Sequence, residues 1–319
     1  MKGPGKSHRK GISLLQLAEM FPTEEAATKW FEKQMWPTER GCPKCGSVKT
    51  SEVPNARPMP YWCTDCRSYF SVRTGTALER SKVPLRKWAF AVYIVATNLK
   101  GVSSMKLHRD IGVTQKTAWF MLHRLREAWA AEGPETFGGP VEVDETYIGG
   151  LEKNKPKSKR LGIRGGTGGK MAVVGAKDRE TNRITARVVD RTDRDTLQGF
   201  VESHREDGAT AYTDEHRAYR GLPNHQTVKH SVGEYVNGQA HTQGVESFWS
   251  LLKRGYHGVF HRMSAKHLQR YVDEFAGRHN VRDRDTIDQM TDLVCGLVGR
   301  RLMYRDLIQP TGGRSAVAS

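Results

Sequence analysis

The sequence predicts an α/β protein in which a mixed sheet is flanked by helices, preceded by a helical region that contains a small cysteine module. Three observations predict this class: a Gly/Pro break at 131–140, strand-like patterns that follow it, and helical periodicity elsewhere. The strands expected from alternating or continuous apolar residues are 141–148, 170–176, 184–189 and 209–213. The helices expected around them are 193–204, 244–254 and 264–279. Three strands, a helix, a fourth strand and later helices favour a mixed sheet covered by helices.

The part of the chain before this break is expected to be mainly helical. Residues 12–36 have the pattern of one or two helices, with Thr23 as a candidate N-cap, and residues 84–131 contain two or three more. The cysteine module lies between them, at about 40–76. The tail from Gln309 onward is expected to be disordered.

The net charge points to a polyanionic partner. Lys and Arg number 51 against 35 Asp and Glu, a formal charge of +16 over 319 residues. Nucleic acid is therefore the leading partner class. No apolar run of about 18 residues is present, so we expect no membrane span. The basic N-terminus is a poor secretory signal because its apolar stretch is short and broken by Gln and Glu, and a cytoplasmic location is expected.

Four of the five cysteines form two CxxC pairs separated by 17 residues: Cys42, Cys45, Cys63 and Cys66. Each pair can present two thiolates to one ion, and four such soft ligands suit a tetrahedral zinc ion. A redox-active pair is the alternative interpretation, but two pairs at this separation favour one structural Zn²⁺. Because all four positions would be filled by cysteine, this ion would stabilise the module rather than react. Cys295 stands alone near the C-terminus.

A helix-turn-helix pattern follows the cysteine module. Residues 103–110 predict a short helix, 111–113 a glycine-containing turn, and Thr114 the cap of a helix that extends to about residue 130. If this unit binds DNA, the early residues of the second helix that could reach base edges are Gln115, Lys116 and Thr117. A plain helical hairpin remains the alternative.

A basic, glycine-rich insertion at 151–169 separates the first two strands. Its end, GIRGGTGGK, lacks the glycine spacing of a phosphate-binding loop, and Lys170 is followed by Met171 instead of Ser or Thr. We therefore expect a basic loop, with Lys170 at its end, that contacts nucleic-acid phosphates.

Three carboxylates stand at positions that suit metal chemistry. Asp144 lies in the first strand of the α/β region, Asp214 closes the fourth strand, and Glu246 opens the helix that follows. A charged side chain in an apolar strand is costly unless it is paired or binds a metal. By strand alternation Glu142 shares the face of Asp144, whereas Glu145 points to the opposite face. Oxygen ligands from three separate elements suit Mg²⁺ or Mn²⁺, and two such ions can support phosphoryl transfer.

Four segments carry a family resemblance: VEVDETYIGG, TDEHRAY, HTQGVESFWSLLKRG and SAKHLQRYVDEFAGRHN. They resemble the core of bacterial insertion-sequence DDE transposases of the zinc-ribbon, ISXO-like branch, and CPKC…CTDC resembles the ribbon that precedes that core. The resemblance covers roughly 15–280. It implies a ribonuclease H-like core and two catalytic Mg²⁺ or Mn²⁺ ions held by Asp144, Asp214 and Glu246.

The resemblance also assigns roles around these ligands. Lys253, two helical turns beyond Glu246, matches a basic residue expected to contact DNA phosphate, and Arg254 is its neighbour. Gln243 stands where family members often have Asn, a residue that some are described as using in the third catalytic position. Glu246 is favoured here because a carboxylate binds Mg²⁺ more strongly than an amide. The closing R-x-N, Arg278 and Asn280, is expected to hold the last helix against the sheet.

The domain order implied is an N-terminal helical region (1–39), a zinc ribbon (40–76), a helix-turn-helix-like DNA-binding region (77–133), a ribonuclease H-like catalytic domain (134–282) and a C-terminal helical extension with a tail (283–319). The expected protein is a bacterial transposase, associated with the nucleoid when bound to DNA, that cuts and joins its element's terminal inverted repeats to target DNA as a homodimer. Two alternatives remain open: a non-catalytic DNA-binding regulator, and a metal-dependent nuclease without strand transfer.

Overall fold

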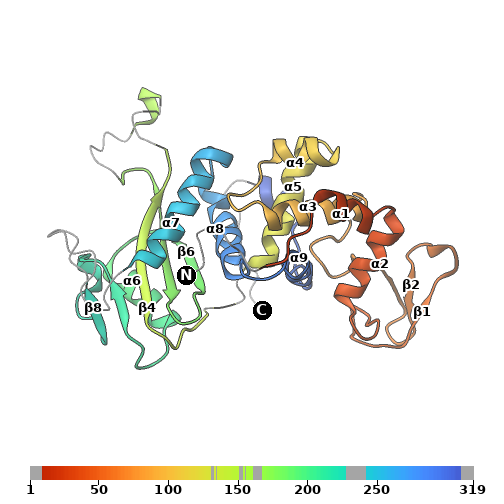
Figure 1. Cartoon of the computed structure of the whole chain (residues 1–319), viewed down its shortest axis with the longest axis horizontal. Helices are drawn as coiled ribbons and strands as arrows, with labels where there is room; N and C mark the ends of the chain where they lie inside the picture. Colours follow the sequence, from red (N-terminus) through yellow and green to blue (C-terminus); the bar gives the residue numbers. More distant parts are fainter. Residues whose placement is uncertain are drawn as a thin grey trace. The chain divides into compact units, whose positions relative to one another are not determined.

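The computed structural model describes residues 9–130, 133, 135–150, 154, 156–160, 167–227 and 242–309. The chain divides into two compact units, one made of residues 1–129 and 281–319 and the other of residues 130–280 (Figure 1). The predicted disordered tail after Gln309 and most of the predicted basic insertion lie outside the described residues.

The first unit is mainly helical. Its α-helices are α1 (Leu14–Met20), α2 (Glu24–Met35), α3 (Leu85–Thr97), α4 (Ser104–Ile111), α5 (Gln115–Arg126), α9 (Thr286–Cys295) and α10 (Tyr304–Ile308). Buried apolar side chains from α1, α2, α3, α4, α5 and α9 form one core, in which Trp88 and Met121 are almost completely buried. Thr23 caps α2 as predicted, since its hydroxyl accepts a hydrogen bond from the Ala26 amide at 3.2 Å. The C-terminal α9 packs against α2 and α3, so distant parts of the chain complete this core.

The predicted pair of short helices is confirmed in α4 and α5. Ser103 caps α4 and Thr114 caps α5 through their side chains, and the turn between them passes through Gly112 at φ 60°. Glycine adopts this left-handed conformation without the steric cost that other residues meet. The second helix is shorter than expected: α5 ends at Arg126 and continues as a 3₁₀ turn, Glu127–Trp129.

The cysteine module contains a small antiparallel sheet. Its strands are β1 (Thr50–Glu52), β2 (Tyr61–Cys63) and β3 (Ser68–Phe70), in the order β1-β2-β3. Tyr61, Phe70 and the half-buried Trp36 pack together beside the buried Cys42 and Cys63. The sequence between and after the two cysteine pairs therefore supplies the strands, and Trp36, which precedes the first pair, completes the aromatic core.

The second unit contains the predicted mixed sheet, with the strand order β6-β5-β4-β7-β8. The strands are β4 (Val141–Ile148), β5 (Met171–Asp178), β6 (Ile184–Val189), β7 (Ala211–Thr213) and β8 (His225–Thr227). β4, β5 and β6 are antiparallel neighbours, whereas β7 is parallel to β4 and β8 is parallel to β7. The sequence did not predict β8, because three polar or half-buried residues at a sheet edge carry no hydrophobic pattern.

Helices cover both faces of this sheet, which confirms the predicted α/β class. Val173 packs with α7 (Gln243–Gly255) and α8 (Ala265–Asn280), while the next residue, Val174, packs with α6 (Arg194–His204) on the opposite face. Asn280 fastens α8 to β6, because its side chain accepts a hydrogen bond from the Ile184 amide at 2.8 Å and donates one to the Ile184 carbonyl at 2.9 Å. The predicted structural role of Asn280 is confirmed, whereas Arg278 pairs with Glu274 within α8 at 3.4 Å.

Candidate functional site

The N-terminus of α7 is anchored to β4 by a buried glutamate. Glu142 accepts a hydrogen bond from the Val245 amide at 3.0 Å and one from Arg179 Nε at 2.9 Å. A carboxylate at a helix N-terminus satisfies an otherwise unpaired amide and complements the helix dipole. A Cβ atom on Gly244 would lie 2.7 Å from Glu142 Oε2, so only glycine permits this close approach. Glu142 thus positions the first turn of α7, which carries Glu246.

Asp144 is held from the same helix, one turn further along. Trp249 donates a hydrogen bond through Nε1 to Asp144 Oδ2 at 3.0 Å. Asp144 stands opposite Gly175 of β5, and a Cβ at Gly175 would lie 2.8 Å from two atoms of the Trp249 ring. The glycine therefore leaves the space in which the indole reaches across the sheet. Sequence reasoning placed Trp249 in the core, where it does lie, but did not find its bond to Asp144.

The three predicted carboxylates interact electrostatically. Burial raises the pKa of Asp144 to about 7, and repulsion from Glu145, Asp214 and Glu246 adds to this shift. These groups come from β4, from the residue that follows β7, and from the first turn of α7. Like charges close together disfavour ionisation, so a bound cation would relieve the repulsion. Hard oxygen donors with this surplus of negative charge fit Mg²⁺ or Mn²⁺ in chemistry.

Asp214 and Glu145 belong to a second set of contacts at the same sheet edge. Asp214 Oδ1 accepts a hydrogen bond from the His216 amide at 3.0 Å. Glu145 accepts one from the Tyr219 hydroxyl at 2.9 Å and lies 3.8 Å from His216 Nε2. Burial raises the pKa of Glu145, and the negative charge of Asp214 raises it further by a smaller amount. Glu145 thus contacts Tyr219 in the core on the α6 side, while Asp144 contacts Trp249 on the α7 side.

Sequence reasoning missed Tyr219 and the buried partners of Glu145. Tyr219 is fully buried, and burial raises its pKa well above the ordinary tyrosine value. The one signal in the sequence was its place five residues after Asp214, in TDEHRAY. Spacing alone does not show that this hydroxyl reaches back to β4.

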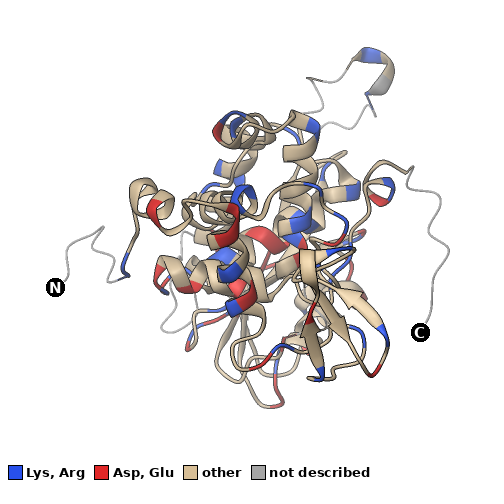
Figure 2. Cartoon of the chain, turned by 90° about the vertical axis from the view of Figure 1, so that its right-hand side faces the viewer, with Lys and Arg blue, Asp and Glu red and all other residues tan. Residues whose placement is uncertain are grey.

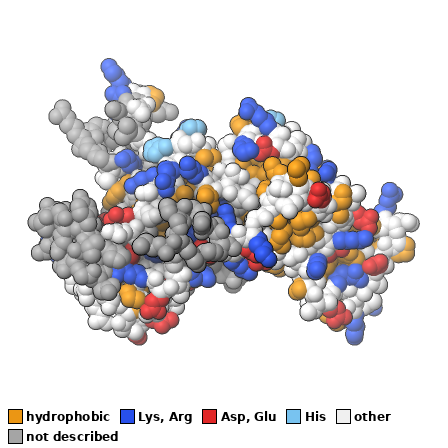
Figure 3. All heavy atoms as spheres, viewed as in Figure 1, with side chains coloured by type: hydrophobic (Ala, Val, Ile, Leu, Met, Phe, Trp, Pro, Cys, Tyr) orange, Lys and Arg blue, Asp and Glu red, His pale blue; other side chains and the backbone are white. Residues whose placement is uncertain are grey.

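Glu246 lies on the exposed side of α7. It accepts a hydrogen bond from the Thr242 hydroxyl at 2.9 Å, and Gln243, the first residue of the helix, is also exposed. Lys253 and Arg254 occupy the last turn and are exposed, as are His257 and His261 just beyond. Figure 3 shows basic and histidine side chains gathered over the C-terminal end of α7. A surface of this composition suits phosphate groups.

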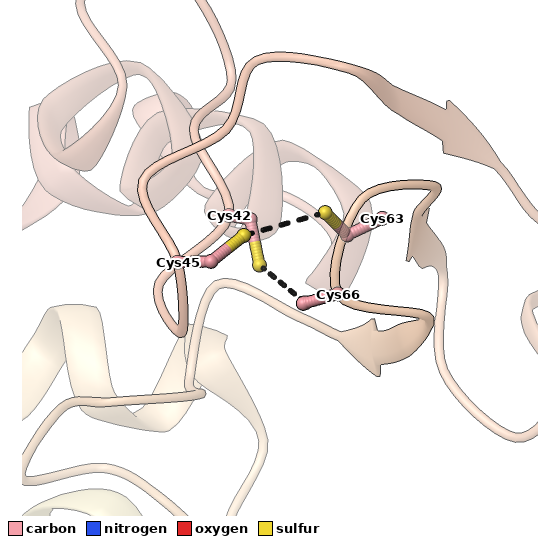
Figure 4. A group of neighbouring side chains, drawn as sticks. All are labelled: Cys42, Cys45, Cys63 and Cys66. Atoms are coloured by element: carbon pink, nitrogen blue, oxygen red, sulfur yellow. Dashed lines mark hydrogen bonds between the residues drawn. The ribbon is translucent and has the colours of Figure 1, made fainter.

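The four predicted zinc ligands are gathered at one point (Figure 4). The Sγ atoms of Cys42 and Cys66 are 3.6 Å apart, as are those of Cys45 and Cys63, and all four lie within 4.8 Å of one another. Zn–S bonds of about 2.3 Å in a tetrahedron require sulfur–sulfur distances of roughly 3.8 Å, so the cluster fits a zinc ion. The backbone amide of Cys66 lowers the pKa of the Cys63 thiol to about 7, whereas burial and the other three cysteine side chains raise that of Cys45 to about 12.

Within the described ranges, the cysteines are the one group of three or more candidate ligands whose atoms all lie this close together. Asp144, Asp214 and Glu246 do not form such a group among the described residues. Their assignment as metal ligands stays a prediction.

The predicted DNA-reading residues at the start of α5 are partly engaged in local contacts. Gln115 donates a hydrogen bond to Ser104 Oγ at 2.8 Å, and Thr117 Oγ1 lies 2.8 Å from Thr114 Oγ1. Lys116 Nζ lies 4.6 Å from the centre of the Tyr304 ring of α10. The contact between Lys116 and Tyr304 was not predicted, because Tyr304 is far away in the sequence.

Lys170, half-buried, immediately precedes β5. Lys and Arg recur in both units rather than in one segment (Figure 2).

Among the described helices, none is long and apolar enough to cross a membrane. DNA contact by Gln115, Lys116, Thr117, Lys170, Lys253 and Arg254 stays a prediction.

Comparison with known proteins gives the family context of these sites. Residues 136–280 match the ISXO2-like transposase domain. An uncharacterized protein in transposable element ISH50 of Halobacterium salinarum is 32% identical over 249 residues, which cover 73% of this chain and 83% of that protein. The domain match lies within the second unit, and the similarity to the ISH50 protein is longer than that unit.

Proposed function

Because this chain belongs to the ISXO2-like transposase family, we propose that it binds the terminal inverted repeats of its own insertion sequence and catalyses metal-dependent cleavage and strand transfer. The observation that carries this proposal is the raised pKa of Asp144, to which burial contributes most and the charges of Glu145, Asp214 and Glu246 add. They come from three elements of one sheet-and-helix unit. The order β6-β5-β4-β7-β8, with antiparallel first strands and parallel later ones, supports a ribonuclease H-like catalytic core.

In this proposal Asp144, Asp214 and Glu246 would hold two Mg²⁺ or Mn²⁺ ions, and such ions can activate an attacking oxygen and stabilise a leaving oxygen in phosphoryl transfer. The remaining residues position these ligands. The indole N–H of Trp249 donates a hydrogen bond to Asp144 Oδ2, and the Thr242 hydroxyl donates one to Glu246 Oε1. Glu142 holds the start of α7 against β4.

The chemistry consists of two in-line displacements at phosphorus. Water attacks the phosphodiester at the element end, loses its proton to solvent, and releases a 3′-hydroxyl. That hydroxyl then attacks a phosphodiester of target DNA, loses its proton, and displaces the 3′ oxygen of the target strand. Bond number is conserved in the second step, and no covalent bond to the protein is formed. Lys253 and Arg254 would bind DNA phosphates beside this site.

DNA recognition is assigned to the first unit. The zinc ribbon and the α4–α5 pair would bind the terminal repeats, with Lys170 adding a phosphate contact near the catalytic site. Two element ends must be joined, so the active species is proposed to be a homodimer on DNA. Affinity should fall steeply as salt rises, since each phosphate contact releases counterions.

Strand transfer from pre-cut ends tests the proposal directly. Duplexes ending in the element's terminal repeat with a free 3′-hydroxyl are incubated with a supercoiled plasmid, the protein and Mg²⁺. We expect joined products with the native protein and none with Asp144→Asn or Asp214→Asn. Glu145→Gln is the matched control, because it removes a neighbouring carboxylate on the other face of β4. Cleavage without joining would identify a nuclease, and binding alone would identify a regulator.

The third ligand has its own test. Glu246→Gln should abolish joining while Gln243→Ala keeps most of it, because only Glu246 supplies a carboxylate. Loss of activity in Gln243→Ala with retention in Glu246→Gln would assign the third position to Gln243.

A further inference from the structure

A small cavity in the first unit is lined by three arginines. Its volume is about 120 Å³, and its lining includes Glu79, Arg80, Phe120, Arg124, Arg301 and Tyr304. These residues come from the segment after the zinc ribbon, from α5, and from the C-terminal segment at α10. A water molecule occupies about 30 Å³ of liquid, so the cavity has room for one phosphate-sized group.

Arg124 is the unusual member of this lining. Its side chain is only 8% exposed, its guanidinium lies 4.3 Å from the centre of the Phe120 ring, and one nitrogen donates to the Glu79 carbonyl at 3.1 Å. Its Nε has no hydrogen-bond partner among the residues that the structure describes. A buried cationic donor left without an acceptor is costly. Arg124 thus contributes a buried guanidinium group, not fully hydrogen-bonded, to the lining of the cavity.

The surrounding charges make an anion the matching ligand. Arg80 and Arg301 are exposed at the same cavity, and Arg73 is close enough to Arg124 to lower its pKa in addition to the larger effect of burial. The one carboxylate of the lining, Glu79, accepts the Gly75 amide at 3.3 Å and lies 3.8 Å from Arg80, and its negative charge acts on Arg124, so three guanidinium groups stand against one carboxylate. Guanidinium groups bind phosphate oxygens through a planar fork of N–H donors. An apolar ligand would leave these donors unpaired.

The cavity is continuous with the face of α5 that α10 contacts. Lys116, Phe120 and Arg124 are spaced four residues apart, so they lie along one face of the helix. Tyr304 contacts the first two of them, with its ring centre 5.6 Å from that of Phe120. A phosphate bound in the cavity would thus hold a DNA strand along α5, whose first residues are the candidates for contacts with the bases.

We propose that this cavity binds a phosphate group of the DNA backbone, with Arg124 as the buried anchor and Arg80 and Arg301 at its mouth. The proposal rests on the proposed function in one respect, that the phosphate belongs to DNA. It assigns a specific backbone contact to the C-terminal segment, which thereby forms part of the DNA-binding surface together with α5.

The test measures binding of a short fluorescein-labelled duplex by the full-length protein carrying Asp144→Asn, without Mg²⁺, over a series of salt concentrations. Arg124→Lys keeps the charge but loses the fork, and should weaken binding about tenfold, as expected for a hydrogen bond to a charged group. Arg301→Ala should lower the slope of log affinity against log salt by about 0.9, the value for one phosphate contact. Arg305→Ala is the matched control, since Arg305 is an exposed arginine of α10 outside the cavity.

Unchanged affinity in Arg124→Lys with an unchanged melting temperature would overturn the proposal. If that variant fails to fold, Arg301→Ala decides, because an unchanged salt slope there would overturn it as well. A parallel arm measures melting in sodium phosphate against sodium chloride of equal ionic strength. Stabilisation by phosphate that is lost in Arg124→Lys, with duplex binding intact, would show a site for free phosphate and contradict the assignment to DNA. Failure of strand transfer with this binding preserved would refute the proposed catalysis alone.

Discussion

Gly175→Ala is expected to destabilise the second unit because of the indole that lies against this glycine. The added Cβ would approach two carbon atoms of the Trp249 ring to 2.8 Å, whereas carbon atoms in contact normally stay about 3.5–4.0 Å apart. The gap is therefore short by roughly 0.7 Å or more. Trp249 is 3% exposed and packed in the core, so its ring has little room to move. We expect a loss of about 1–3 kcal/mol in the free energy of unfolding, the usual cost of overpacking.

Urea denaturation followed by circular dichroism measures this loss. Gly199→Ala is the matched control: Gly199 lies within α6 with nothing within 4 Å of an added Cβ, so alanine there should stabilise the protein by about 0.5–1 kcal/mol. The same substitution at two glycines should thus have opposite signs. The double mutant Gly175→Ala with Trp249→Phe adds a further check, because a smaller ring should relieve the clash and give a favourable coupling energy. Native stability of Gly175→Ala, or a coupling energy near zero, would show that the added Cβ does not clash with the indole ring.

Three further predictions concern the carboxylates and the zinc module. The pKa of Asp144 is about 7 in the folded protein against an ordinary 3.8, so its protonated carboxyl group stabilises the folded state. This contribution is fully present below pH 4 and is lost as the pH rises through 7. Asp144→Asn, melted at pH 8 without added Mg²⁺, should therefore be more stable than the native protein by on the order of 2–4 kcal/mol; a lower melting temperature would contradict this. Tyr219→Phe should cost about 1–3 kcal/mol because it removes a donor to the buried Glu145, whereas Tyr69→Phe, at a tyrosine 39% exposed, should be close to neutral in the same urea titration. Metal analysis should find one zinc per chain, and Cys42→Ser should lower it and unfold the ribbon; a native protein with almost no zinc would argue against the site.

Local signals in the sequence predicted much of the helical unit. Ser103, Gly112 and Thr114 define α4 and α5 because caps and left-handed turns depend on residues only a few positions apart. The CxxC pairs predicted the gathered thiols for the same reason, since each knuckle is a local turn. Strand β8 escaped prediction because its pairing with β7 depends on the sheet and not on its own residues.

Patterns along the chain were enough to predict the class of fold, the cysteine cluster and the carboxylates that are candidate ligands. Only the tertiary structure decided how these carboxylates are held: Glu142 against the α7 N-terminus, Trp249 on Asp144 through the gap at Gly175, and Tyr219 on Glu145. Each contact joins residues more than 70 positions apart. The pKa of a carboxyl group depends on burial and neighbouring charge, and both are properties of the folded chain that no spacing along the sequence can specify.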